Sequence, residues 1–363
     1  MRVRAFRNLA DADLALPDAG CVIVGPNGHG KTSLIEALLY CEVFRSFRGA
    51  ADRECVRFGA DGFHIEVGVV EGGGRRQAAV DGRQQAAGGR VVTAGFDART
   101  RQKKVTVDGA VPERLADAIG LVRGVVLSPD DVVLVGGAPK ERRRYLDVLL
   151  ALTVRGYVEA LTTYRRALAQ RAKATPAESG AWERILAGNG TRIVEARRAW
   201  AEQWGAAYAS QCAAMGESGE PKLAYAPRTD GGEAALAEAF ERSRERDRAL
   251  GRTSVGPHRD ELRLTLGGRP LRHYGSAGQQ RTAAIALRLL EADAMAAQGA
   301  NAVVCLDDAF AELDAERSHR LGELIDARAR AGSQIVAAVP KEHDVPEVLA
   351  TLPRWRMEDG RVK

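Results

Sequence analysis

A glycine-rich segment near the start of the chain has the residue types of a phosphate-binding loop. Residues 25–32 fit the pattern G-x-x-x-x-G-K-[ST] without a mismatch. Glycines let the backbone turn so that its N–H groups and the start of the following helix face anionic oxygens. Lys31 then reaches the β- and γ-phosphates of ATP, and Thr32 binds Mg²⁺. The predicted nucleotide contacts are Gly25, Pro26, Asn27, Gly28, His29 (as a permissive loop position), Gly30, Lys31 and Thr32.

Two acidic residues follow an apolar run towards the other end of the chain. Residues 302–306 form a strand-sized apolar segment, and Asp307 and Asp308 come directly after it. This is the form of a Walker B motif, so we expect Asp307 to bind the metal. Asp308 is then placed to orient or deprotonate the attacking water, and with Lys31 it is a predicted catalytic residue. The alternative is that both aspartates only cap the next helix.

A third segment joins a helix start to residues that can contact phosphate. Ser276 precedes an Ala- and Leu-rich run and is suited to cap the helix there. The order Ser-x-Gly-Gln ahead of a Walker B strand also matches the ABC signature, which contacts the γ-phosphate bound by a partner subunit. We therefore predict that Ser276, Gly278 and Gln279 bind the nucleotide of a second copy. Residues 311–314 occupy the D-loop position, where the two subunits would touch.

Strands and helices of recognisable pattern surround these motifs. The apolar run 21–24 predicts a buried strand before the glycine-rich loop, and the apolar spacing over 32–44 predicts a helix after it. Alternating segments within 63–107 predict an antiparallel sheet. Its turns are expected at 72–74, 81–82 and 108–109. Further strands are expected at 124–127, 261–266 and 302–306, and a helix from Ala277.

The middle of the chain differs in composition from both ends. Ala, Arg, Leu and Glu recur with helical spacing between Lys140 and Arg248, with weak breaks at 174–180 and 216–232 and no long heptad repeat. This predicts an inserted compact helical lobe. The expected fold class is α/β, an ABC-type ATPase head with a mixed core sheet and an antiparallel sheet. The expected domains are 1–130 (head, with the P-loop), 131–250 (helical lobe) and 251–363 (head, with the signature, Walker B and D-loop).

Composition excludes several classes of protein. Of the 363 residues, 45% are hydrophobic and 28% charged, an ordinary globular balance. Apolar runs stay far below the roughly 20 residues of a membrane helix, and the N-terminus lacks a signal-peptide pattern, so we expect a cytoplasmic protein with no membrane partner. The five scattered cysteines form no Cys-x-x-Cys pair and read as core thiols. The net charge of +5 fits a polyanion partner without identifying one.

Several further segments make the pattern more specific. They are 6–9, 33–37, 128–131, 142–147, 256–262 and 275–281. With the motifs above, they make the whole chain resemble the RecF family of bacterial DNA replication and repair proteins, relatives of the SMC-type ATPase heads. The resemblance implies an ATP-dependent homodimer that binds single-stranded, duplex or gapped DNA irrespective of sequence. It also implies work with RecR and RecO, which indirectly serves the recombinase, in recombinational gap repair, replication restart and SOS induction.

The motifs depart from the usual ABC pattern in three places. Ala277 stands where most signatures have Gly, no Gln follows Leu127, and residues 334–339 lack the switch His of transporters. These departures predict slow hydrolysis, and the activity that we expect is that of a weak ATPase stimulated by DNA. We interpret His343 as a surface-loop residue rather than a replacement sensor. Two alternatives stay open: an ABC transporter ATPase subunit, which should have a shorter insertion and a switch His, and a nucleotide-gated DNA clamp without significant hydrolysis.

Basic residues occur in short runs along the chain. Each run could neutralise DNA phosphates or simply be a solvated face. Arg142 to Arg144 could equally form ion pairs with acidic residues of the head, and Trp200 and Trp204 have the spacing of core residues. The runs are 75–76, 99–104, 140–144, 165–166 and 197–198.

Overall fold

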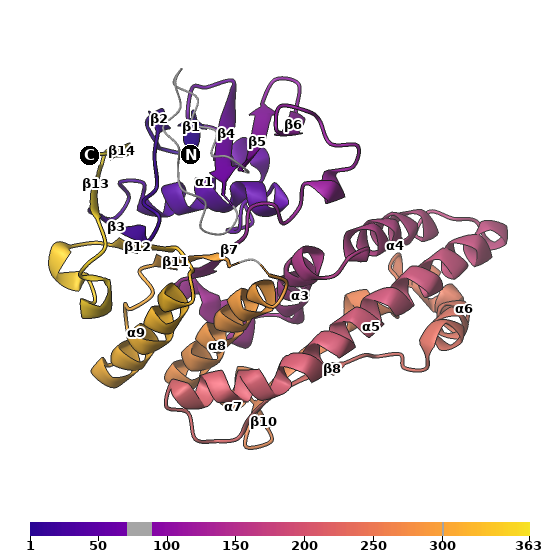
Figure 1. Ribbon diagram of the computed structural model, residues 1–363. Helices are drawn as coiled ribbons and strands as arrows, with labels where there is room; N and C mark the ends of the chain where they lie inside the picture. Colours follow the sequence, from indigo (N-terminus) through magenta and orange to yellow (C-terminus); the bar gives the residue numbers. More distant parts are fainter. Residues whose placement is uncertain (71–88, 300) are drawn as a thin grey trace. The chain divides into compact units, whose positions relative to one another are not determined.

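The computed structural model describes residues 1–70, 89–299 and 301–363 (Figure 1). The chain forms two compact units: unit 1 comprises Met1–Pro129 and Glu291–Lys363, and unit 2 comprises Asp130–Leu290. Unit 1 is therefore discontinuous in sequence. Residues 251–290 go with unit 2 by compactness, while their assignment to the ATPase head stays a prediction. The turns predicted at 72–74 and 81–82 lie outside the described residues.

A six-stranded sheet forms the centre of unit 1. Its strand pairs are parallel except β13 with β14, so the predicted mixed sheet is confirmed. Four of its strands are apolar and largely buried, as expected where both faces of a parallel sheet are covered. The strands expected at 21–24, 124–127 and 302–306 all belong to it. The order is β14 (Arg361–Val362), β13 (Arg354–Glu358), β3 (Gly20–Val24), β12 (Ile335–Val339), β11 (Val303–Asp307) and β7 (Gly124–Leu127).

An antiparallel sheet forms a second layer of unit 1, as residues 63–107 predicted. Buried residues alternate along its two long strands, which is typical of a sheet with one covered face. After the last strand, Asp108 and Gly109 have φ values of 53° and 84° and make the predicted turn. The order is β2 (Ala12–Asp13), β1 (Arg2–Arg4), β4 (Gly62–Val69), β5 (Arg90–Asp97) and β6 (Gln102–Val107).

Helix α1 (Lys31–Val43) packs against both sheets of unit 1 (Figure 1). It contacts β4 and β5 on one side and β11 and β12 on the other. Its residues are buried nearly all round, which is the expected pattern for a helix enclosed by other elements rather than one at a surface. The remaining elements of unit 1 are η1 (Asp52–Cys55), η2 (Leu115–Asp117), α9 (Ala315–Arg330), η5 (Glu342–Asp344) and η6 (Glu347–Leu349).

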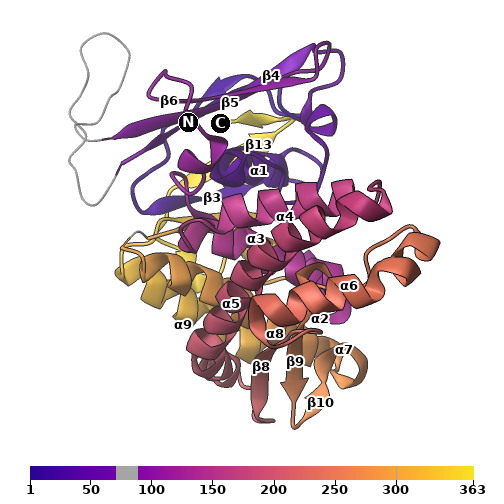
Figure 2. The same ribbon diagram turned by 90° about the vertical axis from the view of Figure 1, so that its right-hand side faces the viewer.

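Unit 2 is mainly helical. Helix α5 (Pro176–Ala214) runs between α4 (Tyr157–Arg171) and α6 (Gly232–Leu250) and packs against both (Figure 2). A three-stranded sheet has the order β10 (Arg269–Pro270), β9 (Glu261–Leu266), β8 (Pro221–Ala226). The other elements are η3 (Pro129–Val132), α2 (Val133–Gly136), α3 (Pro139–Thr153), η4 (Pro257–Arg259) and α7 (Leu271–Tyr274). Helix α8 (Ala277–Ala296) begins in unit 2 and ends in unit 1.

The predicted breaks in the helical region had different outcomes. A break between α4 and α5 exists, but it lies at residues 172–175 rather than at 174–180, because α5 begins at Pro176. The second break, at 216–232, contains β8, a strand that no apolar pattern had indicated. Strand β9 agrees with the prediction for 261–266, and β8 pairs with it along its whole length.

A buried polar cluster joins three helices of unit 2. Its members are Asp147 of α3, Tyr157 and Arg165 of α4, and Arg197 of α5; we call it the Asp147 cluster. The carboxylate of Asp147 accepts from Arg197 Nη2 at 2.7 Å, from Tyr157 Oη at 2.7 Å and from Arg165 Nη2 at 2.9 Å. Burial alone would lower the pKa of Arg197, but Tyr157 and Asp147 hold it well above its usual value. Arg197 is 2% exposed, so the cluster is part of the core.

Two of the family-like segments contact each other in unit 2. Arg142 donates Nε and Nη2 to the carboxylate of Glu261 at 2.8 and 3.0 Å, and Arg143 donates to the Asp260 carbonyl at 2.8 Å. These bonds tie segment 142–147 to segment 256–262. Arg142 therefore forms an ion pair rather than a free basic surface, with an acidic residue of the predicted head segment 251–363 that lies in unit 2.

Two expectations about composition can be compared with the structure. All five cysteines are free and buried, as predicted for core thiols. None of the helices within residues 1–70, 89–299 and 301–363 has both the length and the apolar character that a bilayer-spanning helix needs.

Candidate nucleotide-binding site

The glycine-rich segment lies between β3 and α1, as the motif requires. Gly30 forms the N-cap of α1 with φ 109°, a left-handed conformation that favours glycine. A side chain at Gly25 would lie 2.3 Å from the Met357 carbonyl oxygen, so that position needs glycine for close backbone approach. The first turn of α1 contains no acidic residue, which leaves the positive end of the helix free to attract an anion.

Lys31 lies inside this loop. Its Nζ donates to the carbonyl oxygens of Gly25 and Pro26 at 2.7 and 3.2 Å and to Asn27 Oδ1 at 3.2 Å. The residue is 4% exposed. Burial lowers the pKa of Lys31, while the charges of Asp308 and Asp307 act in the opposite direction. The ammonium group is therefore held at the loop, within electrostatic reach of the acidic pair.

The phosphate-binding loop and the Walker B strand meet at one edge of the core sheet. Thr32 Oγ1 donates to Asp307 Oδ1 at 3.0 Å, although 275 positions separate them. Strands β3 and β11 are parallel to β12, so their carboxyl ends lie at the same edge. A hydroxyl beside a carboxylate is a donor set that suits a hard divalent cation.

The acidic pair is poorly neutralised by the protein. Burial is the main cause that raises the pKa of Asp307, and Asp308 adds to it against the Thr32 hydrogen bond. Burial also raises the pKa of Asp308, with Lys31 opposing. Asp308 has φ 51°, and its buried Oδ1 has no hydrogen-bond partner among the described residues. This arrangement suits an incoming positive charge or a proton.

Asn8 connects the loop to α1, a role that motif spacing did not reveal. Its Nδ2 donates to the Gly28 carbonyl at 2.8 Å, and its Oδ1 accepts from Ser33 Oγ at 2.9 Å. Beside it, Arg7 donates to both carboxylate oxygens of the fully buried Glu36 at 3.0 and 2.7 Å. Segments 6–9 and 33–37 are thus brought together under the loop. Only their resemblance to the family had indicated them.

His29 has a structural partner in the C-terminal turn. Its Nδ1 accepts from the Asp359 amide at 3.1 Å, and its carbonyl accepts from the Gly360 amide at 2.9 Å. The imidazole therefore helps to fix the tip of the loop against the turn between β13 and β14.

Two charged residues close to the acidic pair were missed from the sequence. Arg48 lies near enough to Asp307 to oppose the rise of its pKa, and it is 3.7 Å from Glu36. Asp344 is near enough to Asp308 to raise its pKa further. Neither belongs to a spacing motif, because the fold rather than the sequence brings them to the site. His343 lies next to Asp344 in η5 with an exposed side chain, as the surface-loop interpretation expects.

Ser276 lies at the start of α8, in unit 2. The Gln279 amide donates to Ser276 Oγ at 3.2 Å, and the Ser276 amide donates to Gln279 Oε1 at 3.0 Å. This reciprocal capping box confirms the cap role. Ser276 is exposed, so the cap leaves its surroundings accessible. The contact of Ser276, Gly278 and Gln279 with a partner's nucleotide stays a prediction, and so does the D-loop role of residues 311–314.

The basic runs have different environments. Arg142 and Arg197 are buried in ion pairs, so they are not available to DNA. Arg99 pairs with Asp61, and Lys103 pairs with Asp52. The run 75–76 lies outside the described residues. Trp200 is buried as predicted for a core residue, and Trp204 is half-buried.

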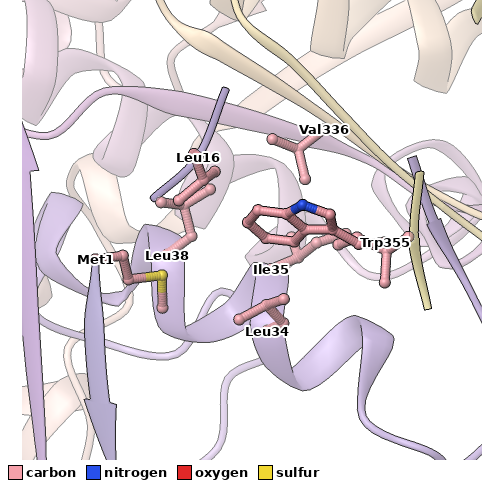
Figure 3. A pocket seen from close by; sticks show the side chains of 8 residues that line it. Met1, Leu16, Leu34, Ile35, Leu38, Val336 and Trp355 are labelled. Carbon is pink, nitrogen blue, oxygen red and sulfur yellow. The ribbon is translucent and has the colours of Figure 1, made fainter. Parts of the chain in front are cut away.

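A small cavity lies beside α1 (Figure 3). Its volume is about 10 Å³, which is the space that one water needs. The lining is apolar, with Leu34, Ile35 and Leu38 of α1 facing Met1, Leu16 and Trp355. A nucleotide fits neither this size nor this chemistry, so the cavity is a packing defect of the core.

The fold and the site define an ABC-type ATPase head of the RecF/RecN/SMC class. The family model described as "RecF/RecN/SMC N terminal domain" matches residues 1–345. Within that class, the chain belongs to the RecF family. It is 36% identical to the DNA replication and repair protein RecF of Chloroflexus aurantiacus over 99% of this chain and 97% of the relative. The RecF protein of Chloroflexus aggregans is also 36% identical, over 100% and 98%.

Solved structures agree with this assignment. The structure of the recombination mediator protein RecF with ATP, in the RecFOR pathway, has a TM-score of 0.86 and 25% identity, covering 100% of this chain and 95% of that one. The Smc head domain of Pyrococcus furiosus has a TM-score of 0.55 and 14% identity, covering 100% of this chain and 94% of that one. This likeness concerns the fold alone. The predicted α/β fold class and the family resemblance are confirmed.

Proposed function

We propose that this chain is an ATP-dependent DNA-binding protein of recombinational gap repair, replication restart and SOS induction. ATP and Mg²⁺ bind at the loop of residues 25–32, two copies dimerise on DNA, and slow hydrolysis follows at composite sites. RecO and RecR are the proposed partners in assisting recombinase loading. The contact of Thr32 with Asp307 is the observation that carries the proposal, because it joins two motifs from opposite ends of the chain.

The residues of the site divide the chemistry among them. Thr32 and Asp307 would hold Mg²⁺, which supplies positive charge to the phosphates. No cluster of three or more His, Cys, Asp or Glu with metal-binding geometry occurs in the described parts of the chain. This fits Mg²⁺, which binds through one or two carboxylates together with phosphates and water. Lys31 neutralises phosphate charge, and Asp308 orients the attacking water or accepts its proton.

Asp308 has the environment of a general base. Burial raises its pKa, so its carboxylate is a stronger base than an ordinary aspartate. Its unpartnered Oδ1 can accept a hydrogen bond from water.

The second half of each site would come from the partner copy. The exposed Ser276 and the start of α8 provide a hydroxyl and backbone N–H groups, a combination that suits the γ-phosphate. Ala277 in place of glycine, and the missing glutamine and switch histidine, favour slow turnover, and we propose that DNA stimulates it. Family membership and the large unit 2 disfavour a transporter subunit.

Ser276→Arg tests the composite site. We expect the variant to fold and bind ATP, because losing a cap costs about 0.5–2 kcal/mol against a typical domain stability of about 5–15 kcal/mol. It should not dimerise, because a bulky cation would fill the space that the partner's γ-phosphate requires. Light scattering of the protein with ATP and Mg²⁺, together with ATPase rates with and without gapped DNA, measures both properties.

Two control variants separate binding from dimerisation. Ser276→Thr keeps the hydroxyl and should dimerise with ATP. Lys31→Met should lose ATP binding or its productive geometry before dimerisation is possible. Normal dimerisation of Ser276→Arg would reduce Ser276 to a cap and remove the composite site. A wild-type dimer that forms on DNA but shows no turnover would instead support the nucleotide-gated clamp.

A further inference from the structure

The exposed side of α4 carries an unusual set of side chains. The structure describes every residue of α4, and none of the exposed ones is acidic. The one carboxylate of the helix, Glu159, is half-buried near its start. We call this exposed set the α4 face: Thr162, Thr163, Arg165, Arg166, Ala169 and Gln170.

Helix α6 lies on the other side of α5 (Figure 2). Its exposed surface has the mixed charge that is usual for a solvated helix. Its exposed residues mix both signs, and Arg242 pairs with Glu238 at 3.6 Å. Such a face is close to neutral and needs no partner beyond water. The exposed charges are Glu233, Glu238, Glu241 and Glu245 with Arg242, Arg246 and Arg248.

The positive charge of the α4 face is not cancelled within unit 2. Arg165 contacts Asp147, but that single carboxylate already accepts from the buried Arg197. Within the part of the chain that the structure describes, the Arg166 side chain makes no hydrogen bond or ion pair. The same is true of Lys173, which is exposed just beyond the end of the helix. These cations have donors available for a ligand.

A pocket of about 40 Å³ continues this surface at the C-terminal end of α4. Arg171 at its base is satisfied by Glu183 and Asp247. Arg248 and Arg252 also line it, are exposed, and form no side-chain ion pair with the described residues. The volume exceeds the roughly 10–15 Å³ that one water requires, so a larger polar group can enter. The pocket therefore has both the charge and the space for an anionic oxygen group.

We infer that the α4 face and this pocket form a surface of unit 2 that binds the phosphate backbone of DNA. The inference rests on the DNA binding in the proposed function and adds where the contact lies. Arg, Lys, Thr and Gln are side chains that donate to phosphate oxygens, and such contacts position a duplex without reading its bases. The 15 residues of α4 span about 22 Å, the length of about six base pairs.

A pair of matched triple variants tests this surface. The first combines Arg166→Gln, Lys173→Gln and Arg252→Gln. The control combines Arg198→Gln, Arg242→Gln and Arg246→Gln, which removes the same charge from α5 and α6, where each arginine already has a partner. Fluorescence anisotropy with a labelled gapped duplex of random sequence, in ATP and Mg²⁺ over a salt series, gives affinity and its salt dependence.

We expect the α4 triple to bind DNA at least tenfold more weakly near physiological salt. Each phosphate contact contributes about 0.9 to the slope of log K against log salt, so the slope should fall by roughly 2 to 3. The control triple should bind within about twofold of wild type. Thermal melting and ATP-dependent dimerisation, which should be unchanged in both, show that the variants are folded.

The other outcomes overturn the inference in distinguishable ways. Equal weakening of both triples means that net charge alone matters. If the α4 triple keeps the wild-type affinity and salt slope, DNA binds elsewhere on the protein. The α4 face could then bind an acidic protein instead. Wild-type protein that binds no DNA refutes the DNA part of the proposed function, and this surface with it.

Discussion

Unit 1 and unit 2 each contain a buried cluster of charged residues, and the two clusters are neutralised to different degrees. In the Asp147 cluster, Oδ1 of the aspartate accepts from Arg197 and Oδ2 accepts from Arg165. In unit 1, burial raises the pKa of both Asp307 and Asp308, and Oδ1 of Asp308 has no partner among the described residues. In the first cluster both carboxylate oxygens have a cationic partner, and in the second the Asp308 carboxylate has no hydrogen-bond partner at Oδ1 among the described residues.

This difference indicates that the Asp147 cluster stabilises the fold, whereas the acidic pair of unit 1 takes part in chemistry. Burying an unpaired charge costs several kcal/mol, so a fold gains stability when each buried charge has its partner. An acidic pair left without enough positive charge is unfavourable until a cation or a proton arrives. Perturbed carboxylates of this kind gather at functional sites for that reason. The comparison therefore predicts loss of chemistry from changes in unit 1 and loss of stability from changes in unit 2.

The largest expected effect is on turnover, in Asp308→Asn. The amide cannot accept the proton of the attacking water, and positioned acid–base groups typically contribute about 10²–10⁴-fold. ATP should still bind, because the loop of residues 25–32 is unchanged, so the variant should persist as an ATP-bound dimer. Single-turnover ATPase rates and nucleotide affinity measure the two properties. Normal turnover would remove Asp308 from the mechanism.

The same variant should not lose stability. Because burial raises the pKa of Asp308, the folded protein binds this proton more tightly than the unfolded chain. The ionised carboxylate therefore costs stability above the folded pKa, and the cost disappears as pH falls through that pKa. An uncharged asparagine should leave Tm at neutral pH unchanged or higher. A clear fall in Tm would show that Asp308 is structural, like Asp147.

The next effect is on stability, in Arg197→Met. Removing the guanidinium leaves Asp147 buried with only the half-exposed Arg165 as its cation, and breaking a buried pair costs about 3–5 kcal/mol. Denaturant unfolding measures the loss. Arg198→Met is a matched control, since its side chain reaches the surface and pairs there with Asp230, so it should stay within about 0.5 kcal/mol of wild type. Equal losses in both variants would contradict the special role of the cluster.

The sequence predicted those parts of the site that depend on short spacing. Residues 25–32 and the pair Asp307–Asp308 carry their chemistry in consecutive positions, and parallel strands bring their ends to one edge, so the contact of Thr32 with Asp307 could be anticipated. Strands β3, β7 and β11 of the core sheet, and β4, β5 and β6 of the antiparallel sheet, followed from apolar patterns.

Other features depend on contacts between distant residues that no local pattern records. The pairing of Arg142 with Glu261, and of Arg197 with Asp147, joins separate helices and strands. Arg197 even occurs in a basic run that resembled a surface. Strand β8 was missed because its six residues lie between helices, and its partner β9 comes after another helix. Arg48 reaches the acidic pair only through the fold.

The smallest expected effect is on ATP affinity, in variants of Asn8. This residue belongs to neither charged cluster, but it bonds to the loop of residues 25–32 beside the acidic pair. Asn8→Ala removes its bonds to the Gly28 carbonyl and to Ser33 Oγ. The residue lies at an exposed position, so water can replace much of what is lost. Each bond contributes about 0.5–1.5 kcal/mol net, which corresponds to a two- to tenfold change in an equilibrium constant.

We expect this loss to appear as weaker ATP binding, measured by titration calorimetry, because a looser Gly28 presents its neighbouring N–H groups less accurately to phosphate. Asn8→Asp sharpens the test. It keeps an acceptor for Ser33 but loses the donor to Gly28, and it adds a negative charge near the phosphates, so it should bind ATP more weakly than Asn8→Ala. If both variants bind ATP as wild type does while their Tm falls, Asn8 supports the core of unit 1, and the loop keeps its conformation without the bond from Asn8.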